Sequence, residues 1–436
     1  MKVQLSGGDD RNLMERLLEK QIPLANSCNG KGTCGKCKVK VVSGTITDVT
    51  DTERRLLTEK EVAGRMRLAC MTKSQREVVI ETGEVEEDHV FTTGGVEGHF
   101  KRDADKHGYG LAVDIGTTTV VATLICLDDG TERATYAQIN PQKTYGLDVL
   151  TRITYETEYK EKAITQLQEA IVHGLNEATK GICAEAGIDV TQIGEIDIAA
   201  NCTMLHMLAG VDARPIGRAP YKPSFTDGQK LKARDLGLMG AADAMVYLLP
   251  SVSAYIGADI VAGVYVCDLR HSSGKTLFID IGTNGELVLE AGGKMYSCSC
   301  AAGPALEGMN ITSGMRAAKG AVEDVHIGPD GIRLDVIGKG KPHGLCGSGI
   351  LAVVRELVRT GLVTRRGAFA RPEDFEVGDY RRDILRYNGT KREALLYSSG
   401  ETELLVTQSD VRQVQLAKGA IRSGIEVLLS HGGLTY

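Results

Sequence analysis

The sequence has 436 residues, of which 42% are hydrophobic and 25% charged, and its net charge is −6. This length predicts two or three domains with ordinary hydrophobic cores, and this composition argues against general disorder. The acidic balance beyond residue 83 argues against nucleic-acid binding. No run of eighteen apolar residues and no signal-peptide pattern occur, so we expect no membrane segment. Eleven cysteines, an odd number, favour the reducing cytoplasm over a disulfide framework.

The first 83 residues predict a small α+β module. Short strands are expected at 2–5, 38–42, 66–70 and 77–80, and a helix at about 11–20. A cysteine-rich loop lies between the helix and the second strand. Strands folded around one helix, with such a loop at the edge, resemble the β-grasp ferredoxin fold.

The cysteine loop contains Cys28, Cys34 and Cys37, with five and two intervening residues, and Cys70 follows about thirty residues later. A buried cluster needs four converging thiolates and backbone N–H groups that reach its sulfurs, and three interleaved glycines allow the tight turn. The spacing is close to that of plant-type ferredoxins, with one extra residue in the first gap, so we prefer a 2Fe-2S cluster. Tetrahedral zinc and purely structural cysteines remain alternatives, although zinc sites usually have two Cys-x-x-Cys pairs.

Residues 84–107 contain an acidic run and show no periodic pattern, so we interpret them as a linker. Its flexibility would let the cluster module move between an electron donor and an electron acceptor. Slow hydrogen exchange across residues 86–106 would contradict this hypothesis.

Two similar segments follow, at 110–119 and 276–286. Each is a buried strand that ends in Asp and continues into a turn rich in Gly and Thr, whose N–H and hydroxyl groups can surround phosphate oxygens. Phosphoryl transfer requires positioning and charge neutralisation rather than a covalent nucleophile. One such turn is a weak signal, but two copies, each followed by another apolar strand, resemble the two phosphate loops of the actin, sugar-kinase and Hsp70 (ASKHA) superfamily of ATPases.

This resemblance implies an α/β ATPase domain of two lobes, at 108–270 and 271–436, with a nucleotide cleft between them. It implies that Asp114 holds Mg²⁺ through water and that Asp280 positions the attacking water or a second metal-bound water. The residues that would surround the triphosphate of ATP are Gly116, Thr117, Thr118 and Thr119 on one side and Gly282, Thr283, Asn284 and Gly285 on the other.

The other elements of these lobes follow from apolar periodicity. Helices are expected at 161–185, 256–267, 350–359 and 411–429, and a strand at 193–200 leads to Asn201, which could cap a helix. We interpret His206 as a hydrogen-bonded core histidine rather than a catalytic one.

Two turns rich in small residues lie in the second half of the chain. The turn with Gly303 precedes a proline at a helix start, and the turn with Gly347 and Ser348 opens another helix. The N–H groups of both turns are therefore expected to face the cleft. Cys298 and Cys300 have no partner spacing that would complete a metal site, so we expect them to pack in the core.

The segments Ala-Ala-Gly-Pro-Ala-Leu-Glu-Gly at 301–308 and Leu-Cys-Gly-Ser-Gly at 345–349 make the resemblance more specific. Together with the cysteine loop and the linker they resemble the family of reductive activators of corrinoid-dependent enzymes, over nearly the whole chain. This implies ATP-dependent reduction of Co(II) to Co(I) in corrinoid proteins of methyltransferase systems, by electron transfer from a 2Fe-2S cluster. The implied cofactors are the cluster, ATP and Mg. The implied partners are the corrinoid protein and an electron donor such as a ferredoxin or flavoprotein, without nucleic acid or membrane, and a homodimer is left open.

One feature departs from the superfamily, whose members close the nucleotide site with an adenosine-binding Gly-Gly turn on a late strand and helix. Here Gly432-Gly433 follows the last helix with no strand before it, which predicts a helix C-cap. We therefore expect a C-terminally incomplete ATPase domain, as in a fragment, a truncated gene product or a variant with weakened adenosine binding. The alternatives are a stand-alone 2Fe-2S redox or sensor protein with a degenerate ATPase module, and a small-molecule kinase with an accessory cluster.

Overall fold

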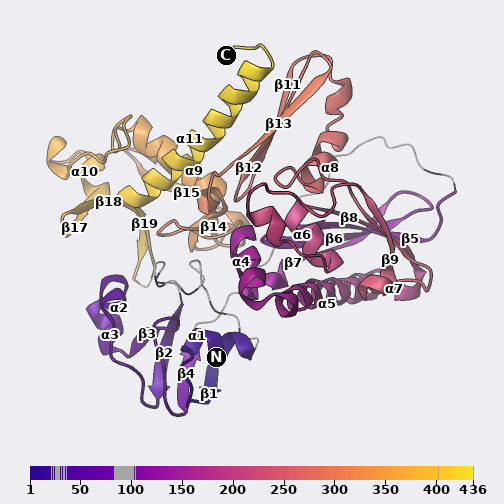
Figure 1. Ribbon diagram of the computed structural model, residues 1–436. Coiled ribbons are helices and arrows are strands. Elements are labelled where there is room, and N and C mark those ends of the chain that lie inside the picture. Colours follow the sequence, from indigo (N-terminus) through magenta and orange to yellow (C-terminus); the bar gives the residue numbers. More distant parts are fainter. Residues whose placement is uncertain are drawn as a thin grey trace.

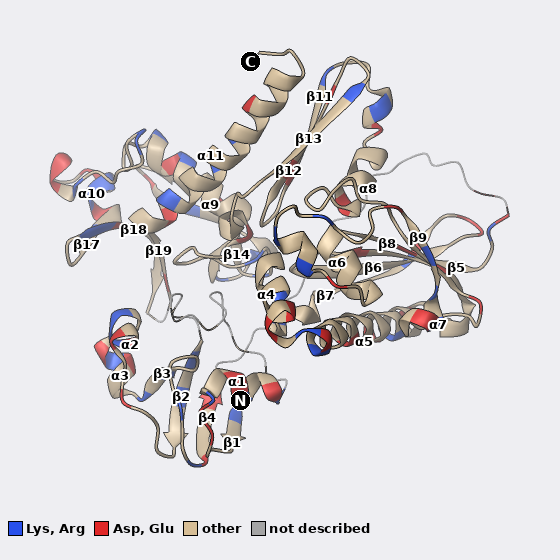
Figure 2. Cartoon of the chain, in the orientation of Figure 1, with Lys and Arg blue, Asp and Glu red and all other residues tan. Residues whose placement is uncertain are grey.

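The computed structural model describes residues 1–20, 22, 24, 30, 32, 35, 37–82, 103, 105–400 and 402–435. Cys28, Cys34 and most of the predicted linker lie outside these residues. The described chain forms an N-terminal module, drawn in indigo and purple, and two larger α/β lobes (Figure 1). Lys and Arg are interspersed with Asp and Glu in all three parts (Figure 2).

The N-terminal module is a four-stranded antiparallel sheet in the order β1-β4-β2-β3. Its strands are β1 (Lys2–Leu5), β2 (Lys38–Ser43), β3 (Met66–Leu68) and β4 (Val78–Thr82). The helix α1 (Leu13–Glu19) buries Leu13 and Leu17 in the same core as Val39 and Ile80. The predicted α+β module is therefore confirmed.

Two short helices in this module were not predicted, α2 (Asp51–Leu56) and α3 (Glu59–Ala63). Each begins with a capping box, in which Thr50 pairs with Glu53 and Thr58 with Glu61. The Thr-x-x-Glu pattern was the available signal in the sequence. Glu53 is fully buried and accepts hydrogen bonds from Nε and NH2 of Arg67 at 2.9 and 2.8 Å, which fixes α2 to β3.

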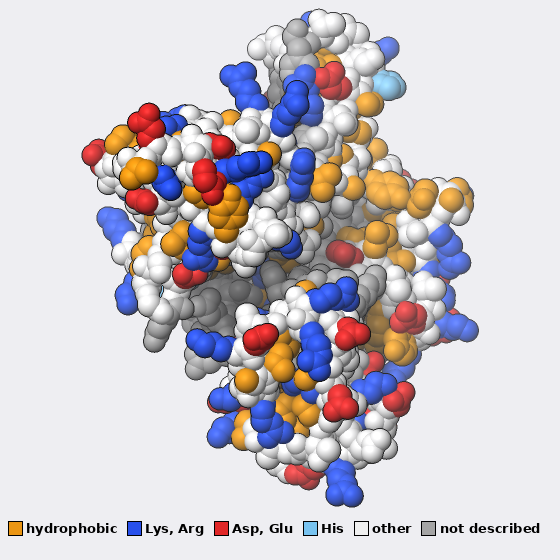
Figure 3. Space-filling view, turned by 90° about the vertical axis from the view of Figure 1, so that its left-hand side faces the viewer, with side chains coloured by type: hydrophobic (Ala, Val, Ile, Leu, Met, Phe, Trp, Pro, Cys, Tyr) orange, Lys and Arg blue, Asp and Glu red, His pale blue; other side chains and the backbone are white. Residues whose placement is uncertain are grey.

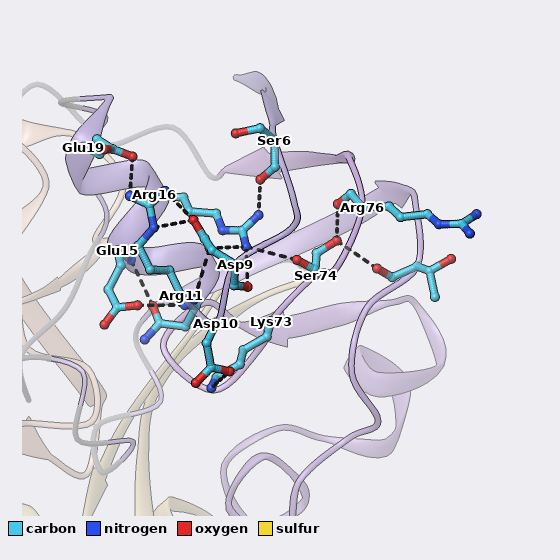
Figure 4. A network of polar contacts seen from close by, with 12 residues as sticks. Ser6, Asp9, Asp10, Arg11, Glu15, Arg16, Glu19, Lys73, Ser74 and Arg76 are labelled. Atoms are coloured by element: carbon cyan, nitrogen blue, oxygen red, sulfur yellow. Dashed lines mark hydrogen bonds and ion pairs between the residues drawn. The ribbon is translucent and has the colours of Figure 1, made fainter.

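A second buried arginine fixes α1. Arg16 is 3% exposed, and its guanidinium donates to Oδ1 of Asp9 at 2.7 Å and to the carbonyl oxygen of Ser74 at 3.0 Å (Figure 4). Asn12 caps the helix, since its side chain accepts from the N–H of Glu15. These contacts join α1 and the loop before it to the turn at 72–76, which follows the predicted ligand Cys70.

The first lobe contains a six-stranded sheet in the order β7-β6-β5-β8-β10-β9. Its strands are β5 (Tyr109–Ile115), β6 (Thr119–Cys126), β7 (Glu132–Ile139), β8 (Ile193–Ala200), β9 (Gln229–Lys232) and β10 (Met245–Leu248). The helices are α4 (Val149–Tyr159), α5 (Glu161–Ala186), α6 (Cys202–Ala209), α7 (Ala233–Leu236) and α8 (Ala258–Val266). β8 runs parallel to β5, with Ile115 paired with Ala200, so the residues that follow these two strands meet at one edge of the sheet.

The second lobe has three small sheets within the described residues. They contain β11 (Thr276–Ile281), β12 (Gly285–Ala291) and β13 (Lys294–Cys300); β14 (Ala321–Gly328), β15 (Gly331–Val336) and β16 (Gly344–Leu345); and β17 (Leu385–Asn388), β18 (Lys391–Ser399) and β19 (Thr402–Thr407). The helices are α9 (Gly347–Arg359), α10 (Tyr380–Ile384) and α11 (Gln408–His431), the long yellow helix of Figure 1.

The predictions for this lobe had mixed outcomes. Cys298 and Cys300 pack as expected, because their Sγ atoms lie 3.7 Å from the carbonyl oxygen of Gly424 and 3.1 Å from that of Gly285. The prediction of a helix after Gly303 is wrong. Only one 3₁₀ turn forms there, Pro304–Glu307, and β13 precedes it. Gly432 is the C-cap of α11, as predicted.

The described helices include none that is both long and apolar enough to cross a bilayer. On the face shown in Figure 3, hydrophobic side chains gather toward one margin, and Lys and Arg are mixed with Asp and Glu over the rest.

Candidate functional site

Cys37 and Cys70 are the described part of the predicted cluster site. Their Sγ atoms are 3.3 Å apart, and the residues are 1% and 5% exposed. The pairing of β2 with β3 brings them together, because Lys38 lies opposite Leu68 and the N–H of Ala69 donates to the carbonyl oxygen of Cys37 at 2.8 Å.

This pair has the chemistry of metal ligands. The hydrogen bond with Cys70 lowers the pKa of the Cys37 thiol to about 7 against the opposing effect of burial, and the thiolate is the metal-binding form. Two sulfurs on one tetrahedral metal ion would be about 3.8 Å apart for bonds of about 2.3 Å, so the pair needs to separate only slightly. Gly30 has a φ of +78°, and a Cβ at this glycine would lie 3.9 Å from Cβ of Cys70, so the loop backbone passes close to the pair.

The other two predicted ligands, Cys28 and Cys34, lie outside the described residues. Among the residues that are described, no three His, Cys, Asp or Glu side chains are grouped so that they could hold a metal ion. Cys37 and Cys70 therefore fit half of a four-thiolate site.

A cavity of about 1090 Å³ lies between the two lobes. Its wall contains ten of the residues predicted for the nucleotide site: Asp114, Gly116, Thr117, Thr118, Thr119, Gly282, Thr283, Asn284, Gly303 and Gly347. The fold thus brings the turn between β5 and β6 and the turn between β11 and β12 to the same cavity. Its volume is at the upper end of the range usual for small-molecule sites.

Three predicted residues are not part of this wall. Gly285 begins β12, where a Cβ would lie 2.8 Å from Sγ of Cys300, so this glycine makes room for β13. Ser348 lies in the first turn of α9, with its hydroxyl 3.3 Å from Sγ of Cys346. Asp280 lies on β11 directly opposite Glu286, whose side chain does line the cavity.

Two asparagines hold the first loop, residues 116–119. The side-chain amide of Asn140 donates to the carbonyl oxygen of Gly116 at 2.8 Å, and that of Asn201 donates to Oγ1 of Thr117 at 3.0 Å. Asn201 also caps α6, as predicted, by accepting from the N–H of Met204 at 3.0 Å. Neither asparagine was predicted as a site residue, because the sequence shows neither that β8 ends beside β5 nor that the residue after β7 reaches Gly116.

Arg152 supports the same loop from behind. It is fully buried, and its guanidinium donates to the carbonyl oxygens of Thr117 and Gly146, the latter at 2.8 Å, and to Oε1 of Gln142 at 3.2 Å. No ion pair with a carboxylate is found for it among the described residues, and burial lowers its pKa to about 9. Its side chain therefore brings a positive charge close to the loop.

Carboxyl groups from both lobes influence one another in the cleft. Burial, and then repulsion from Asp259 and Asp280, raises the pKa of Asp114 to about 6. The exposed surface of Asp114 opens into the cavity, so its carboxyl is wetted but enclosed by protein. Burial also raises the pKa of Glu286 to about 7, where a hydrogen bond from Ser299 opposes it and Asp259 and Asp280 add to it. Grouped carboxylates disfavour ionisation unless a cation is bound, and oxygen ligands suit Mg²⁺.

Glu307 connects the two loops. Its Oε1 accepts from the hydroxyl of Thr283 at 2.6 Å, and its Oε2 accepts from the hydroxyl of Thr118 at 3.3 Å. Glu307 lies in the motif at 301–308 that carried the family resemblance, but it was not predicted as a site residue. Periodicity gives no sign of a contact between residues 189 apart in the chain.

His206 is a core residue, as predicted. It is fully buried, with Nδ1 2.7 Å from the carbonyl oxygen of Cys202, and its Nε2 accepts from the N–H of Ser224 at 3.1 Å. Its ring stacks on Phe225 at 4.2 Å between centroids, and burial lowers its pKa. All of its polar atoms are thus occupied by the protein.

Comparison with known protein families finds a match for each of the three parts of the chain. Residues 2–75 match the 2Fe-2S iron-sulfur cluster binding domain, residues 109–272 match the RACo middle region, and residues 274–436 match the C-terminal domain of RACo, the ASKHA domain. The chain thus has an iron–sulfur domain followed by regions that match the middle region and the ASKHA domain of RACo, which favours the cluster over zinc.

Three similar proteins extend the comparison. The chain is 34% identical over 336 residues to the corrinoid activation enzyme RamQ of Eubacterium limosum, covering 76% of this chain and 56% of that protein. It is 24% identical over 361 residues to the [Co(II) methylated amine-specific corrinoid protein] reductase of Methanosarcina barkeri, covering 75% of this chain and 61% of that protein. The chain thus spans less than two thirds of the length of both curated relatives.

A solved structure, described as a reductive activator for corrinoid, iron-sulfur protein, superposes with a TM-score of 0.67 and 27% identity. The superposition covers 98% of this chain and 82% of that chain. The chain therefore shares its fold with that structure over almost its whole length.

Proposed function

We propose that this chain is an ATP-hydrolysing activator that transfers one electron from a 2Fe-2S cluster to a corrinoid protein of a methyltransferase system, reducing Co(II) to Co(I). One observation carries the proposal: a single chain combines the buried Cys37–Cys70 pair with two Asp-Ile-Gly-Thr turns at one interlobe cavity. The names of the three similar proteins, each of which mentions a corrinoid or a corrinoid protein, support it.

The coupling of the two parts has an energetic reason. Plant-type clusters have potentials near about −400 mV, and we expect the Co(II)/Co(I) couple to be more negative. A gap of roughly 100 to 150 mV corresponds to roughly 2.3 to 3.5 kcal/mol for one electron. Nucleotide binding and hydrolysis can supply this free energy if the two nucleotide states differ in affinity for the corrinoid protein.

We assign the nucleotide-site roles as follows. Asp114 holds Mg²⁺ through water, and Asp280, which lies opposite the cavity-lining Glu286, positions the attacking water. Hydroxyl and N–H groups of 116–119 and 282–284 bind the phosphates, while Gly303 and Gly347 shape the wall of the second lobe. Mg²⁺, when bound, neutralises phosphate charge. Arg316 is the one Lys or Arg in the described wall, and it adds positive charge there.

We further propose that residues 1–83 form the cluster module, 84–107 the linker, and 108–270 and 271–436 the two lobes. The main hydrophobic cores of the module and of the two lobes are separate within the described residues and support this division, while one smaller cluster joins Ile260 of the first lobe to Val288 of the second. The partners are then a corrinoid protein and a ferredoxin or flavoprotein as electron donor, in a reducing cytoplasm.

The test is an anaerobic reduction assay. The reduced protein is mixed with a Co(II) corrinoid protein, with and without MgATP, and the absorption of Co(I) is followed. We expect Co(I) to form only with MgATP, and we expect ATP hydrolysis to rise when the Co(II) protein is added. Asp114→Asn should abolish the ATP-dependent signal, whereas Asp129→Asn, in an exposed turn outside the cleft, should not.

Two outcomes would contradict the proposal. If a dye accepts electrons from the protein but no ATP-dependent Co(I) appears, the stand-alone redox or sensor function is favoured. If Asp129→Asn loses as much activity as Asp114→Asn, the cleft is not the nucleotide site.

A further inference from the structure

Glu307 lies between the two loops that are expected to bind phosphate. Its carboxylate accepts one hydroxyl from each of them, at 2.6 Å from Thr283 in the second lobe and at 3.3 Å from Thr118 in the first lobe. Threonine hydroxyls in such turns are donors that phosphate oxygens need. The carboxylate therefore occupies donors that a triphosphate would use.

The backbone around Glu307 has little freedom to move. Gly308 ends the 3₁₀ turn with a φ of +76°, and a Cβ at this position would lie 2.1 Å from the carbonyl oxygen of Met315. Likewise, a Cβ on Gly347 would lie 1.9 Å from the carbonyl oxygen of Leu306. Because the neighbouring backbone is fixed by these contacts, rotation of the Glu307 side chain is the way to release the threonines.

The two hydrogen bonds differ in strength. A hydroxyl–carboxylate bond of 2.6 Å is in the range of strong, charge-assisted bonds, whereas 3.3 Å is long for this type. The short bond lies within the second lobe, and the long bond is the one that joins the lobes. The link between the lobes is therefore the weaker of the two, and it is the one that is lost first.

We propose that Glu307 is a positioning residue that holds the two loops together in the nucleotide-free protein and yields both threonine hydroxyls to the phosphates of ATP. This rests on the proposed function, in which the cavity binds ATP. A carboxylate and a phosphate oxygen are both negatively charged acceptors, so they cannot share the same two donors. The apparent affinity for ATP is then lowered by the fraction of molecules in which Glu307 occupies the site.

The test compares Glu307→Ala, Glu307→Gln and Glu323→Ala. The first variant removes both hydrogen bonds, and the second keeps the side-chain shape but removes the charge. The third is the matched control, because Glu323 lies exposed on β14 of the same lobe and is not part of the cavity wall. For each protein, hydrogen exchange of segments 116–119 and 282–285 is measured without nucleotide, and the affinity for MgATP is measured by calorimetry.

We expect Glu307→Ala to exchange faster in both loops without nucleotide and to bind MgATP about tenfold more tightly. Glu307→Gln should show smaller increases in hydrogen exchange and in MgATP affinity than Glu307→Ala. Glu323→Ala should match the wild type in both. Unchanged exchange in Glu307→Ala would overturn the inference. So would MgATP affinity that is equal to or weaker than that of the wild type, since that outcome would make Glu307 a ligand of the bound nucleotide or its metal.

The same experiment separates this inference from the proposed function. If the wild type and all variants fail to bind MgATP, the proposed function is wrong and the inference fails with it. If the wild type binds MgATP and only the predicted gain in Glu307→Ala is missing, the inference alone fails.

Discussion

Arg152 holds a positive charge inside the first lobe, and its hydrogen bonds go to neutral oxygens. Among them is the carbonyl oxygen of Thr117, so the charge stabilises the loop by binding its backbone. Buried charged groups are costly unless every donor finds an acceptor. A long side chain without donors would leave these acceptors unsatisfied in the interior.

Arg152→Met is therefore expected to lower the free energy of unfolding of the first lobe by about 2–4 kcal/mol. It should also weaken MgATP binding, because the loop loses its support. Arg133→Met is the matched control: Arg133 forms an exposed ion pair with Asp129, which is expected to contribute less than about 1 kcal/mol. Urea unfolding of both variants measures the difference, and equal losses would contradict a special role for Arg152.

Glu156, one turn further along α4, makes the stability of the folded protein depend on pH. It is fully buried, and within the described part of the chain one of its carboxylate oxygens has no hydrogen-bond partner, while the other accepts from the N–H of Ala213 at 2.9 Å. Burial raises its pKa from 4.5 to about 7. The folded protein therefore keeps a proton there that the unfolded chain releases at lower pH. Stability from this group is fully present below pH 4.5 and is lost as the pH rises through about 7.

Glu156→Gln should remove this dependence, because Gln does not ionise. We expect the wild type to lose about 1–3 kcal/mol relative to Glu156→Gln between pH 4.5 and 8. Glu158→Gln, exposed on the same helix, is the control and should follow the wild type at every pH. The midpoint of thermal unfolding, measured from pH 5 to 8, tests this, and a pH-independent difference would refute it.

At the scale of elements, the second lobe depends on the contact between the start of α9 and the turn Pro304–Glu307. Gly347, the first residue of α9, lets the helix approach the carbonyl oxygen of Leu306. This contact places both Gly303 and Gly347 in the cavity wall. The position of Glu307 thus depends on a helix that begins 40 residues later in the chain.

Gly347→Ala is expected to destabilise the second lobe by about 1–3 kcal/mol, because the new Cβ forces the helix and the turn apart. Affinity for MgATP should fall as well. Gly419→Ala in α11 is the matched control: apart from its chain neighbours and its own helix backbone, no described atom lies within 4 Å of its Cβ position, so it should be neutral or slightly stabilising. Thermal unfolding and calorimetry measure both effects, and the idea fails if the two variants behave alike.

At the scale of the whole molecule, the N-terminal module and the lobes have separate cores. Leu5, Leu68 and Cys70 belong to the core of the module, whereas Leu111 and Ile198 belong to that of the first lobe. A change at the cluster site should therefore leave the nucleotide site intact. Coupling between them would act through the partner and the nucleotide state rather than through a shared core.

Cys70→Ser tests this independence. We expect the variant to lose the visible absorption of the cluster and the formation of Co(I), while its affinity for MgATP stays within about twofold of the wild type. Cys267→Ser, at an exposed cysteine of the first lobe, should change neither property. Loss of MgATP binding in Cys70→Ser would show that the parts are not independent.

Features that depend on neighbouring residues could be predicted from the sequence. The spacing of the cysteines, the two strands that end in Asp114 and Asp280, and the apolar stripe of α5 are local patterns, and periodicity and turn chemistry are enough to interpret them. The capping boxes at Thr50 and Thr58 were equally local and could have been read in the same way. The helix expected after Gly303 failed because the local pattern omits the close packing of Gly308 on Met315, which limits the segment to one turn.

The residues that support and connect the two loops became visible only once distant elements were packed together. Arg152 and Asn201 reach Thr117 from separate elements, and Glu307 meets Thr118 across 189 residues of chain. Such contacts depend on how β5 lies beside β8 and how the two lobes face one cavity. The periodicity of apolar side chains along a helix or strand indicates only which face of that element is buried. It carries no information about distances between elements. The sequence therefore indicated the phosphate-type turns, and the packing of the lobes determined what lies between them.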